Sequence, residues 1–494
     1  MKLIFQGHDY RYAVEQSLLA FFPQERPVYE GGGKNTARVT LSAGRRYHTA
    51  VTELSVEGRT ARGLSRADVS GIQDEYGRER LLQRIVKLSF FKAARELTGV
   101  SPAWGALTGI RPAKLAGQLL EEGRSLREAD RILRDTYFVT PSRRRLCLQC
   151  AQTGLEARQA LAPDEISLYV GIPFCPTRCA YCSFVSNSVE KSFHLVEPYL
   201  EALLEEIDGA AAMVDALGLR VRSFYMGGGT PTTLTAGQME RLLERLHSRF
   251  RLDSAVESTV EAGRPDTITA EKLEALRRCG VTRVSVNPQS MSDAVLAAIG
   301  RRHSADDIRS AMELVGRAGF PHVNMDLIAG LPEDTAEGFR RTLDEGIAFG
   351  TDNITIHTLS LKKGSRITLE GSHIPPEGEV AAMLDYADPT LRGAGFDPYY
   401  LYRQKYMSGS FENVGWCRPG GTGWYNIYIM EELHSILSLG AGGSTKMVDP
   451  ARGRIERVFN LKFPQEYIQR PEKRLANQQA FRCFYEQMRN PLEK

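Results

Sequence analysis

Residues 166–184 read ISLYVGIPFCPTRCAYCSF, and this stretch decides the fold. It begins as a strand-like apolar run, and Cys175, Cys179 and Cys182 then follow in a CxxxCxxC pattern. Cubane iron–sulfur clusters are normally held by four cysteine thiolates. Because this loop supplies three and no fourth cysteine lies nearby, the pattern predicts a cluster with one iron open to another ligand.

A structural zinc site, or buried thiols without a ligand, are the alternatives for the triad. A closed zinc site takes four ligands, usually as two pairs separated by a loop. After Cys182 the next histidine or cysteine is His194, which does not match that spacing. The strand before the triad and Tyr181 within it favour a cluster loop at the end of a strand.

Composition excludes several classes of protein. The 494 residues are enough for two or three domains. Lys and Arg number 63 against 60 acidic residues, so the net charge of +3 gives no reason to expect binding to nucleic acid or to an anionic membrane. No window approaches the roughly 18 apolar residues of a membrane span, and the first residues become polar too soon for a secretory signal. We expect a cytoplasmic protein, where thiolates stay reduced.

An alternation of strands and helices from about residue 166 to 361 predicts an α/β fold, a partial (β/α)6 barrel. Strand-like runs recur near residues 166–171, 221–226, 256–262, 281–289, 322–329 and 353–361. In such barrels, function gathers where the strands end. We expect three parts: an N-terminal accessory α+β domain over 1–160, the barrel over 161–365, and a C-terminal cap over 366–494 that covers the barrel mouth and the substrate.

A glycine-rich loop follows the second predicted strand. It reads YMGGGTPT over residues 225–232. Glycine lets the backbone approach a ligand closely and adopt a positive φ. A tight connection between strand and helix is the other explanation, but the position about fifty residues after the cysteines favours a ligand-binding loop.

Polar residues alternate along three neighbouring predicted strands. They are Glu257, Thr259, Glu261, Ser285, Asn287, Gln289, Asn324 and Asp326. Strands buried in a parallel sheet normally read as continuous apolar runs, and one buried polar residue is usually satisfied by its neighbours. Three adjacent strands with this pattern predict a cavity lined by polar side chains.

These motifs resemble the radical S-adenosylmethionine (SAM) superfamily and, within it, the oxygen-independent coproporphyrinogen III oxidase family. The resemblance covers residues 166–365 and includes NMDLIAGLP over 324–332. The sequence VNPQ over 286–289, residues 104–112 and YYLYRQK over 399–405 look like the longer coproporphyrinogen dehydrogenase HemZ branch of that family.

The resemblance implies a [4Fe-4S] cluster on Cys175, Cys179 and Cys182, with SAM bound to the open iron and cleaved to a 5′-deoxyadenosyl radical. It also implies a tetrapyrrole substrate and a reduced electron donor of the flavodoxin or ferredoxin type. The residues that it assigns to SAM are Tyr169, Gly228, Gly229, Thr230, Glu261, Gln289, Arg302 and Asp326.

The implied activity is oxidative decarboxylation of coproporphyrinogen III propionates to vinyl groups in haem synthesis. Two departures from the oxidases bear on it. Phe184 stands where they have a fourth cysteine, and Gly171 stands where they have a histidine. Because related haem chaperones also carry the phenylalanine, a haem chaperone on the same barrel and a radical enzyme for another tetrapyrrole are alternative functions.

A tetra-anionic substrate needs cationic anchors. The basic candidates are Lys362, Lys363, Arg403 and Lys405. We expect His303 and His357 to be structural, with haem or metal binding as the alternative. Cys417 is expected to be an exposed, inert loop cysteine, with an auxiliary ligand or a reactive thiol as the alternative. Cys147 and Cys150 are expected to be ordinary helix cysteines.

Overall fold

The computed structural model describes residues 1–489 except 73, 110, 183–186, 362–364 and 405–410. These residues form two compact units. The first comprises residues 1–148 together with Phe411, and the second comprises the other described residues from 149 onward. Helix α5 (Pro141–Gln159) carries the chain from the first unit into the second.

The first unit contains a four-stranded sheet in the order β1-β2-β3-β4, in which β1 is parallel to β2 and the other pairs are antiparallel. Its elements are β1 (Lys2–Gln6), α1 (Arg11–Phe21), β2 (Thr36–Ala43), β3 (Tyr47–Val56), β4 (Arg59–Asp68), α2 (Glu75–Thr98), α3 (Pro112–Glu121) and α4 (Leu126–Asp135). The small N-terminal α+β module predicted from sequence is thus confirmed.

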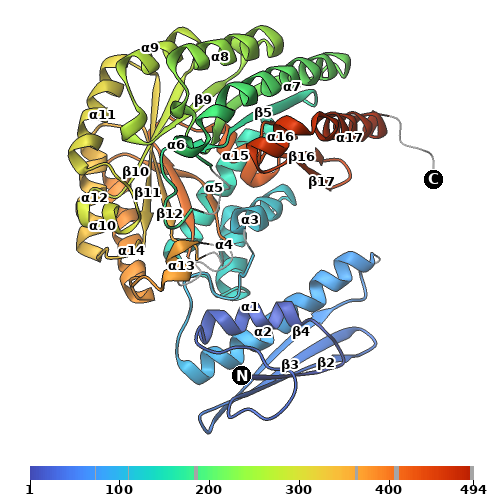
Figure 1. Ribbon diagram of the computed structural model, residues 1–494. Coiled ribbons are helices and arrows are strands. Elements are labelled where there is room, and N and C mark those ends of the chain that lie inside the picture. Colours follow the sequence, from blue (N-terminus) through green and yellow to red (C-terminus); the bar gives the residue numbers. More distant parts are fainter. Residues whose placement is uncertain (73, 110, 183–186, 362–364, 405–410, 490–494) are drawn as a thin grey trace. The chain divides into compact units, whose positions relative to one another are not determined.

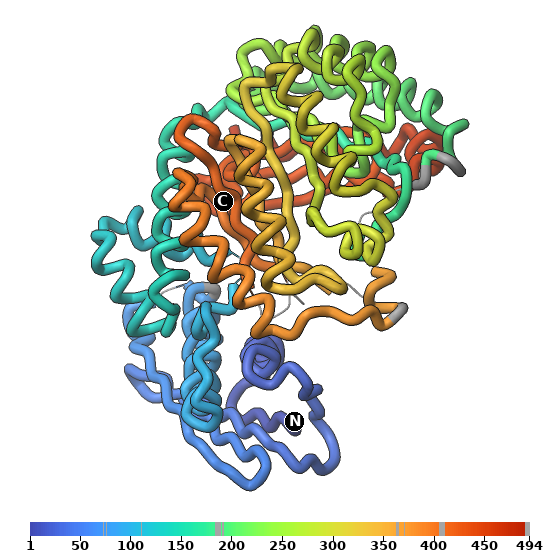
Figure 2. Tube along the Cα trace, turned by 90° about the vertical axis from the view of Figure 1, so that its left-hand side faces the viewer, coloured from blue at the N-terminus to red at the C-terminus, as the bar shows by residue number. Residues whose placement is uncertain are grey.

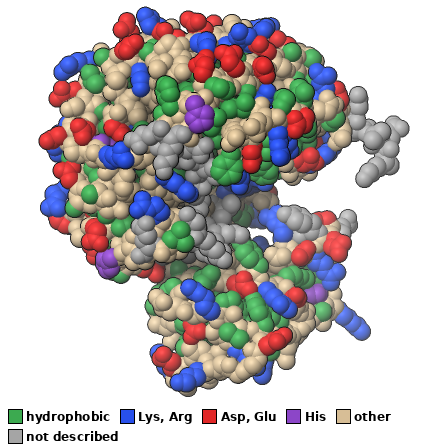
Figure 3. Space-filling view, viewed as in Figure 1, with side chains coloured by type: hydrophobic (Ala, Val, Ile, Leu, Met, Phe, Trp, Pro, Cys, Tyr) green, Lys and Arg blue, Asp and Glu red, His purple; other side chains and the backbone are tan. Residues whose placement is uncertain are grey.

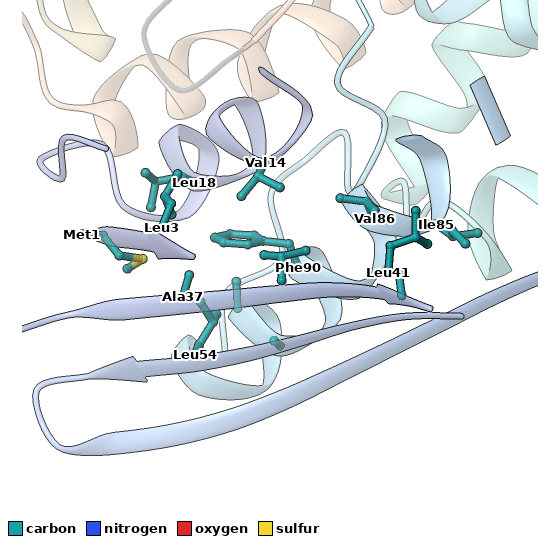
Figure 4. Close-up of a cluster of buried hydrophobic side chains, with 14 residues drawn as sticks. Met1, Leu3, Val14, Leu18, Ala37, Leu41, Leu54, Ile85, Val86 and Phe90 are labelled. Carbon is teal, nitrogen blue, oxygen red and sulfur yellow. The ribbon is translucent and has the colours of Figure 1, made fainter. Parts of the chain in front are cut away.

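The core of this unit lies between the sheet and helices α1 and α2. Ala37 and Leu41 of β2 alternate onto the same face as Leu54 of β3, and they meet Val14 of α1 and Phe90 of α2 (Figure 4). A period of two along the strands and of about 3.6 along the helices places these apolar residues on facing surfaces. The hydrophobic pattern therefore accounts for this core.

The second unit contains an 11-stranded sheet in the order β13-β14-β12-β11-β10-β9-β8-β5-β15-β16-β17. Its centre is a run of parallel strands in chain order. These strands are β5 (Glu165–Ile172), β8 (Arg220–Gly228), β9 (Glu257–Gly263), β10 (Arg283–Gln289), β11 (His322–Ala329) and β12 (Asn353–Thr358). The strands do not close on themselves, so the predicted partial barrel is confirmed.

Helices cover the outer face of these strands (Figure 1). They are α7 (Val196–Ala216), α8 (Ala236–Phe250), α9 (Ala270–Arg278), α10 (Asp293–Ala298), α11 (Ala305–Ala318), α12 (Ala336–Ala348) and α14 (Glu377–Gly393). Capping boxes begin two of them, at Thr235 before α8 and at Ser304 before α11. The short elements β6 (Phe174–Cys175), β7 (Asn187–Ser188) and α6 (Val189–Ser192) follow β5, and α13 (Arg366–Glu370) follows β12.

The C-terminal residues, orange to red in Figure 2, extend both edges of the sheet. Their aromatic side chains pack against Tyr169 and Tyr225 of the central strands. Strands β14 (Asn413–Cys417) and β13 (Asp397–Tyr402) add to β12, whereas β15 (Ile436–Leu439), β16 (Ser444–Asp449) and β17 (Arg454–Phe459) add to β5. Helices α15 (Trp424–Glu431), α16 (Pro464–Gln469) and α17 (Pro471–Arg489) complete the chain. These strands supply the hydrogen-bond partners that the edges of the parallel sheet would otherwise lack.

Candidate active site

The loop that carries the three cysteines begins at the C-terminal end of β5 and is tied to the glycine-rich loop after β8. Gly229 donates its backbone N–H to the carbonyl of Ile172 at 2.8 Å, and Thr230 donates to the carbonyl of Phe174 at 2.7 Å. The Thr230 hydroxyl also lies 3.5 Å from Cys175 Sγ. The two motifs that the sequence analysis singled out therefore form one structure.

Two buried arginines hold other parts of the cysteine loop. Arg264 Nη1 donates to Thr177 Oγ1 at 2.6 Å. Arg301 Nη2 donates to the hydroxyl of Tyr181 at 2.9 Å, and Tyr181 lies between the second and third cysteines. These contacts fix the path of the loop through side chains that lie far apart in the sequence.

The donors on this loop fit an iron–sulfur cluster. Cys175, Cys179 and Cys182 are all partly exposed, and the Thr230 hydroxyl beside Cys175 is suited to stabilise a thiolate. Within the part of the chain that the structure describes, no three His, Cys, Asp or Glu side chains are placed to share a single metal ion. In a cubane cluster each thiolate binds a different iron, so the three cysteines need not surround a single metal ion.

The glycines of the loop over 227–229 are required by packing. A Cβ on Gly229 would lie 2.5 Å from the carbonyl oxygen of Phe174, and one on Gly227 would lie 2.8 Å from the carboxyl carbon of Glu261. Gly228 has a φ of 104°, which favours glycine. The loop therefore fits between the cysteine strand and the Glu261 carboxylate without room for side chains.

Two carboxylates and an imidazole lie near the C-terminal ends of the strands. Tyr225 donates its hydroxyl to Glu261 Oε1 at 2.6 Å. Burial raises the pKa of Glu261 to about 7, and the charge of Asp326 adds to the rise. His357 Nε2 lies 3.7 Å from Asp326 Oδ2, and Tyr402 OH lies 3.4 Å from His357 Nδ1. These carboxylates suit a ligand that brings hydrogen-bond donors, such as an ammonium or hydroxyl groups.

Gln289 ends the neighbouring strand β10 with a φ of 71°, and its side chain is only 7% exposed. Its Oε1 has no hydrogen-bond partner among the described residues. Buried polar atoms are normally paired, so a ligand with hydroxyl or ammonium groups would supply the missing donor. SAM carries both groups, and the site therefore fits this cofactor.

The structure brings most of the residues assigned to SAM into this one region. They are Tyr169, Gly228, Gly229, Thr230, Glu261, Gln289 and Asp326. Arg302, in contrast, is exposed. Its neighbour Arg301 is 8% exposed and donates to the carbonyl of Asn287 at 2.9 Å as well as to Tyr181. Sequence reasoning missed Arg301, because nothing in two consecutive arginines tells which one is buried.

Tyrosines from the C-terminal region pack inside the barrel. Tyr425 stacks on Tyr225 with ring centroids 4.6 Å apart, and Tyr169 lies 6.4 Å from Tyr425. The backbone N–H of Tyr425 donates to Glu257, which also lies 3.6 Å from the guanidinium of Arg283. Polar side chains nearer the start of the strands are therefore engaged with one another and with the C-terminal segment, whereas the sequence analysis expected them to line a cavity.

Cys417 does not have the exposed loop position that the sequence predicted. This residue lies within β14, not in a loop, and it is buried because β14 pairs with β12 on one side and β13 on the other. Burial raises the pKa of its thiol to about 11. Cys147 and Cys150 lie in helix α5, as predicted, and both are buried.

Other candidates for substrate or haem contacts are placed as follows. His303 is buried, and its Nδ1 lies 3.6 Å from Asp266 Oδ1. Arg264 forms an ion pair with the same Asp266 carboxylate. Arg403 follows β13, and burial lowers its pKa to about 10. Outside the described residues lie Phe184, Lys362, Lys363 and Lys405.

Comparison with known proteins identifies the family. Residues 169–346 match the family model of the radical SAM superfamily. The chain is 39% identical over 380 residues to the oxygen-independent coproporphyrinogen-III oxidase-like protein HemZ of Bacillus subtilis, covering 76% of each chain. The chain belongs to the HemZ family of radical SAM proteins. Radical SAM proteins use a [4Fe-4S] cluster and SAM, the two groups that the cysteine loop and the carboxylate site fit.

Two further likenesses bear on the HemZ family. The heme chaperone HemW of Mycobacterium tuberculosis is 33% identical to this chain, and the alignment covers 63% of this chain and 76% of HemW. The structure of the radical SAM enzyme coproporphyrinogen III oxidase (HemN) from Escherichia coli matches with a TM-score of 0.52 at 24% identity, over 65% of this chain and 72% of that one. The HemN likeness shows a common fold.

Proposed function

We propose that this HemZ-family chain is a coproporphyrinogen dehydrogenase, which converts propionate side chains of coproporphyrinogen III to vinyl groups and so yields protoporphyrinogen IX in haem synthesis. The radical SAM chemistry in this proposal is supported by one observation. The cysteine loop and the glycine loop are joined by hydrogen bonds from Gly229 and Thr230, and Glu261 packs directly against Gly227. The cluster-binding and SAM-binding residues thus form one site.

We assign the cluster to Cys175, Cys179 and Cys182. When bound, the cluster and SAM would supply the radical chemistry that removes a hydrogen atom from the propionate carbon next to the ring. Loss of carbon dioxide and of one electron to an external acceptor would then leave the vinyl group. The protein's part is to hold and shield the reactants.

Each polar residue of the site has a role in that task. Glu261, held by the Tyr225 hydroxyl, would accept hydrogen bonds from the ammonium of SAM, and Asp326 with Gln289 would accept from its hydroxyls. We assign the role of the arginine that faces the site to Arg301 and not to Arg302, because Arg301 is buried beside the cysteine loop.

The substrate assignment is supported by the HemZ likeness and by the chemistry of the C-terminal residues. Tyr400 and Tyr402 lie with parallel rings 6.3 Å apart, and Arg403 follows them at the end of β13. Aromatic side chains suit the flat apolar pyrrole rings, and a guanidinium suits a propionate carboxylate. We propose Arg403 as one of the carboxylate anchors.

A haem chaperone is the second candidate function, because the HemW relative shares 33% of aligned residues with the chain. That function predicts stable binding of one haem and no decarboxylation. A radical reaction on another tetrapyrrole is the third. It predicts SAM cleavage that depends on a different substrate.

Two further assignments follow from the chemistry. Within the described residues, no helix is long and apolar enough to cross a membrane. We propose a cytoplasmic location, since cluster thiolates require a reducing compartment. We also propose a reduced flavodoxin or ferredoxin as electron donor.

The deciding experiment is anaerobic incubation of the cluster-reconstituted protein with SAM, dithionite and coproporphyrinogen III. Mass spectrometry would follow 5′-deoxyadenosine and the vinyl product, with Cys179→Ala as the inactive control. Formation of both products by the wild type alone establishes the dehydrogenase. Formation of 5′-deoxyadenosine without vinyl product, or haem binding alone, would reject it in favour of the other functions.

A further inference from the structure

The outer side of the cysteine loop carries exposed positive charge. Arg178 lies within the cysteine motif, Arg302 follows the buried Arg301, and Arg366 begins α13; all three are exposed. We call these three residues the arginine rim. They come from segments far apart in the sequence that the fold brings together.

The three segments of the arginine rim are in direct contact. Ala180 of the cysteine loop donates its N–H to the carbonyl of Ile299 at 2.9 Å and accepts from the N–H of Ile367 at 3.3 Å. The carbonyl oxygen of Arg178 and Nη1 of Arg366 each lie 3.9 Å from the position of a Cβ on Gly300. The arginine rim thus borders the loop that holds Cys179.

The arginine rim brings exposed basic side chains from three segments to one place. On the face shown in Figure 3, acidic and basic side chains are intermixed, as the net charge of +3 leads one to expect. Beside the rim, Leu369 lies three residues after Arg366 on α13, so the two share a helix face, and Leu369 is 73% exposed. A basic rim next to an exposed apolar side chain is the composition of a protein-binding surface.

We propose that the arginine rim and Leu369 form the docking surface for a small acidic one-electron carrier protein with a flavin or iron–sulfur centre. This inference rests on the proposed function, because each reductive cleavage of SAM consumes one electron from such a carrier. Electron transfer needs the carrier close to the cluster, and the rim borders the loop that binds it. Complementary charge steers such a partner and makes its binding sensitive to salt.

The test compares charge reversals in the full-length protein. The variants are Arg366→Glu and the double variant Arg178→Glu/Arg366→Glu. Arg340→Glu is the matched control, since Arg340 lies on α12 and is 46% exposed. The probe is a purified acidic flavodoxin, and its Kd is measured by calorimetry in the oxidised form, where no turnover occurs. SAM cleavage driven by dithionite is measured in parallel.

We expect the Kd for flavodoxin to rise about tenfold or more in the rim variants at low salt, and the difference to shrink at high salt. Arg340→Glu should bind like the wild type, and Arg366→Glu should retain dithionite-driven SAM cleavage. Equal Kd values for all proteins, or equal weakening by Arg340→Glu, would overturn the docking surface. Failure of the wild type to cleave SAM with dithionite would instead overturn the proposed function, whatever the Kd values are.

Discussion

Tyr225 donates its hydroxyl to Glu261 across 2.6 Å, inside a barrel where burial raises the pKa of the Glu261 carboxyl to about 7. The charge of Asp326 adds to the rise, and the Tyr225 hydrogen bond opposes it. Roughly half of the molecules therefore carry a protonated Glu261 at neutral pH before a ligand binds. A residue proposed to hold an ammonium group is thus poised to titrate near pH 7.

The raised pKa of Glu261 predicts that SAM binding depends on pH. A charged Glu261 attracts an ammonium and a protonated one does not, so the affinity is full above pH 7 and is lost as the pH falls through 7. The Kd for SAM should rise about tenfold from pH 7.5 to pH 6, measured by calorimetry. In Glu261→Gln the Kd should be higher and nearly constant over this range. A constant Kd in the wild type would show that Glu261 does not hold the ammonium.

His357 should shift that pH dependence. Its charge lowers the pKa of Glu261, and its Nε2 lies 3.7 Å from Asp326. In His357→Leu the two carboxylates lose this compensation, so the midpoint of the SAM-binding profile should move to higher pH. His322→Gln is the control, because His322 pairs with Asp352 at the opposite end of β11. An unchanged midpoint in His357→Leu would contradict the assignment.

Gly229→Ala should separate the two loops of the site. The added Cβ would lie 2.5 Å from the carbonyl of Phe174, next to Cys175. We expect a loss of about 1–3 kcal/mol in the free energy of unfolding, seen as a lower midpoint in thermal unfolding, and a lower iron content after reconstitution. Gly237→Ala in α8 meets no heavy atom within 4 Å and should stabilise the protein by about 0.5–1 kcal/mol. Equal behaviour of the two variants would refute the packing argument.

The sequence predicted the features that depend on local pattern. The CxxxCxxC spacing lies within one loop, and the six barrel strands recur with helical segments between them, so both are readable from neighbouring residues. Strand β12 ends at Thr358, earlier than the predicted run to residue 361, which is within the usual uncertainty of an element's boundary.

The features that sequence reasoning missed depend on partners far along the chain. Ile436 of β15 pairs with Ser167 of β5, and Cys417 of β14 pairs with Asn353 of β12. No local pattern indicates which edge of a sheet a late strand joins, so the sequence does not show that the C-terminal strands extend the sheet, and Cys417 reads as exposed. Arg301 and Arg302 differ only in which of them the tertiary structure buries.

Cys417 should be unreactive in the folded protein. Its pKa of about 11 leaves about 100-fold less thiolate at pH 8 than a thiol with the ordinary value of 9.0, and burial restricts access further. We expect alkylation by iodoacetamide, followed by peptide mass spectrometry, to label Cys417 only after unfolding. Cys417→Ala should retain SAM cleavage. Rapid labelling of the folded protein, or loss of cleavage in Cys417→Ala, would point to the auxiliary ligand that the buried position argues against.

Substitution of Arg301 and substitution of Arg302 should affect the site differently. Arg301→Gln removes the donors to Tyr181 and to the carbonyl of Asn287. Leaving buried acceptors without donors costs about 1–3 kcal/mol, and the cysteine loop should bind less iron. Tyr181→Phe, which removes the other partner of one bond, should show a smaller effect of the same kind. Arg302→Gln changes an exposed side chain and should alter stability by less than about 0.5 kcal/mol.

The measurement that separates them is the Kd for SAM, together with the cluster absorbance after reconstitution. If Arg301 faces the site, Arg301→Gln weakens SAM binding, and Arg302→Gln leaves both the Kd and the absorbance near the wild-type values. A larger rise in the Kd with Arg302→Gln would return the SAM contact to Arg302. Its guanidinium would then have to turn inward when the cofactor binds, because Arg302 is exposed in this structure.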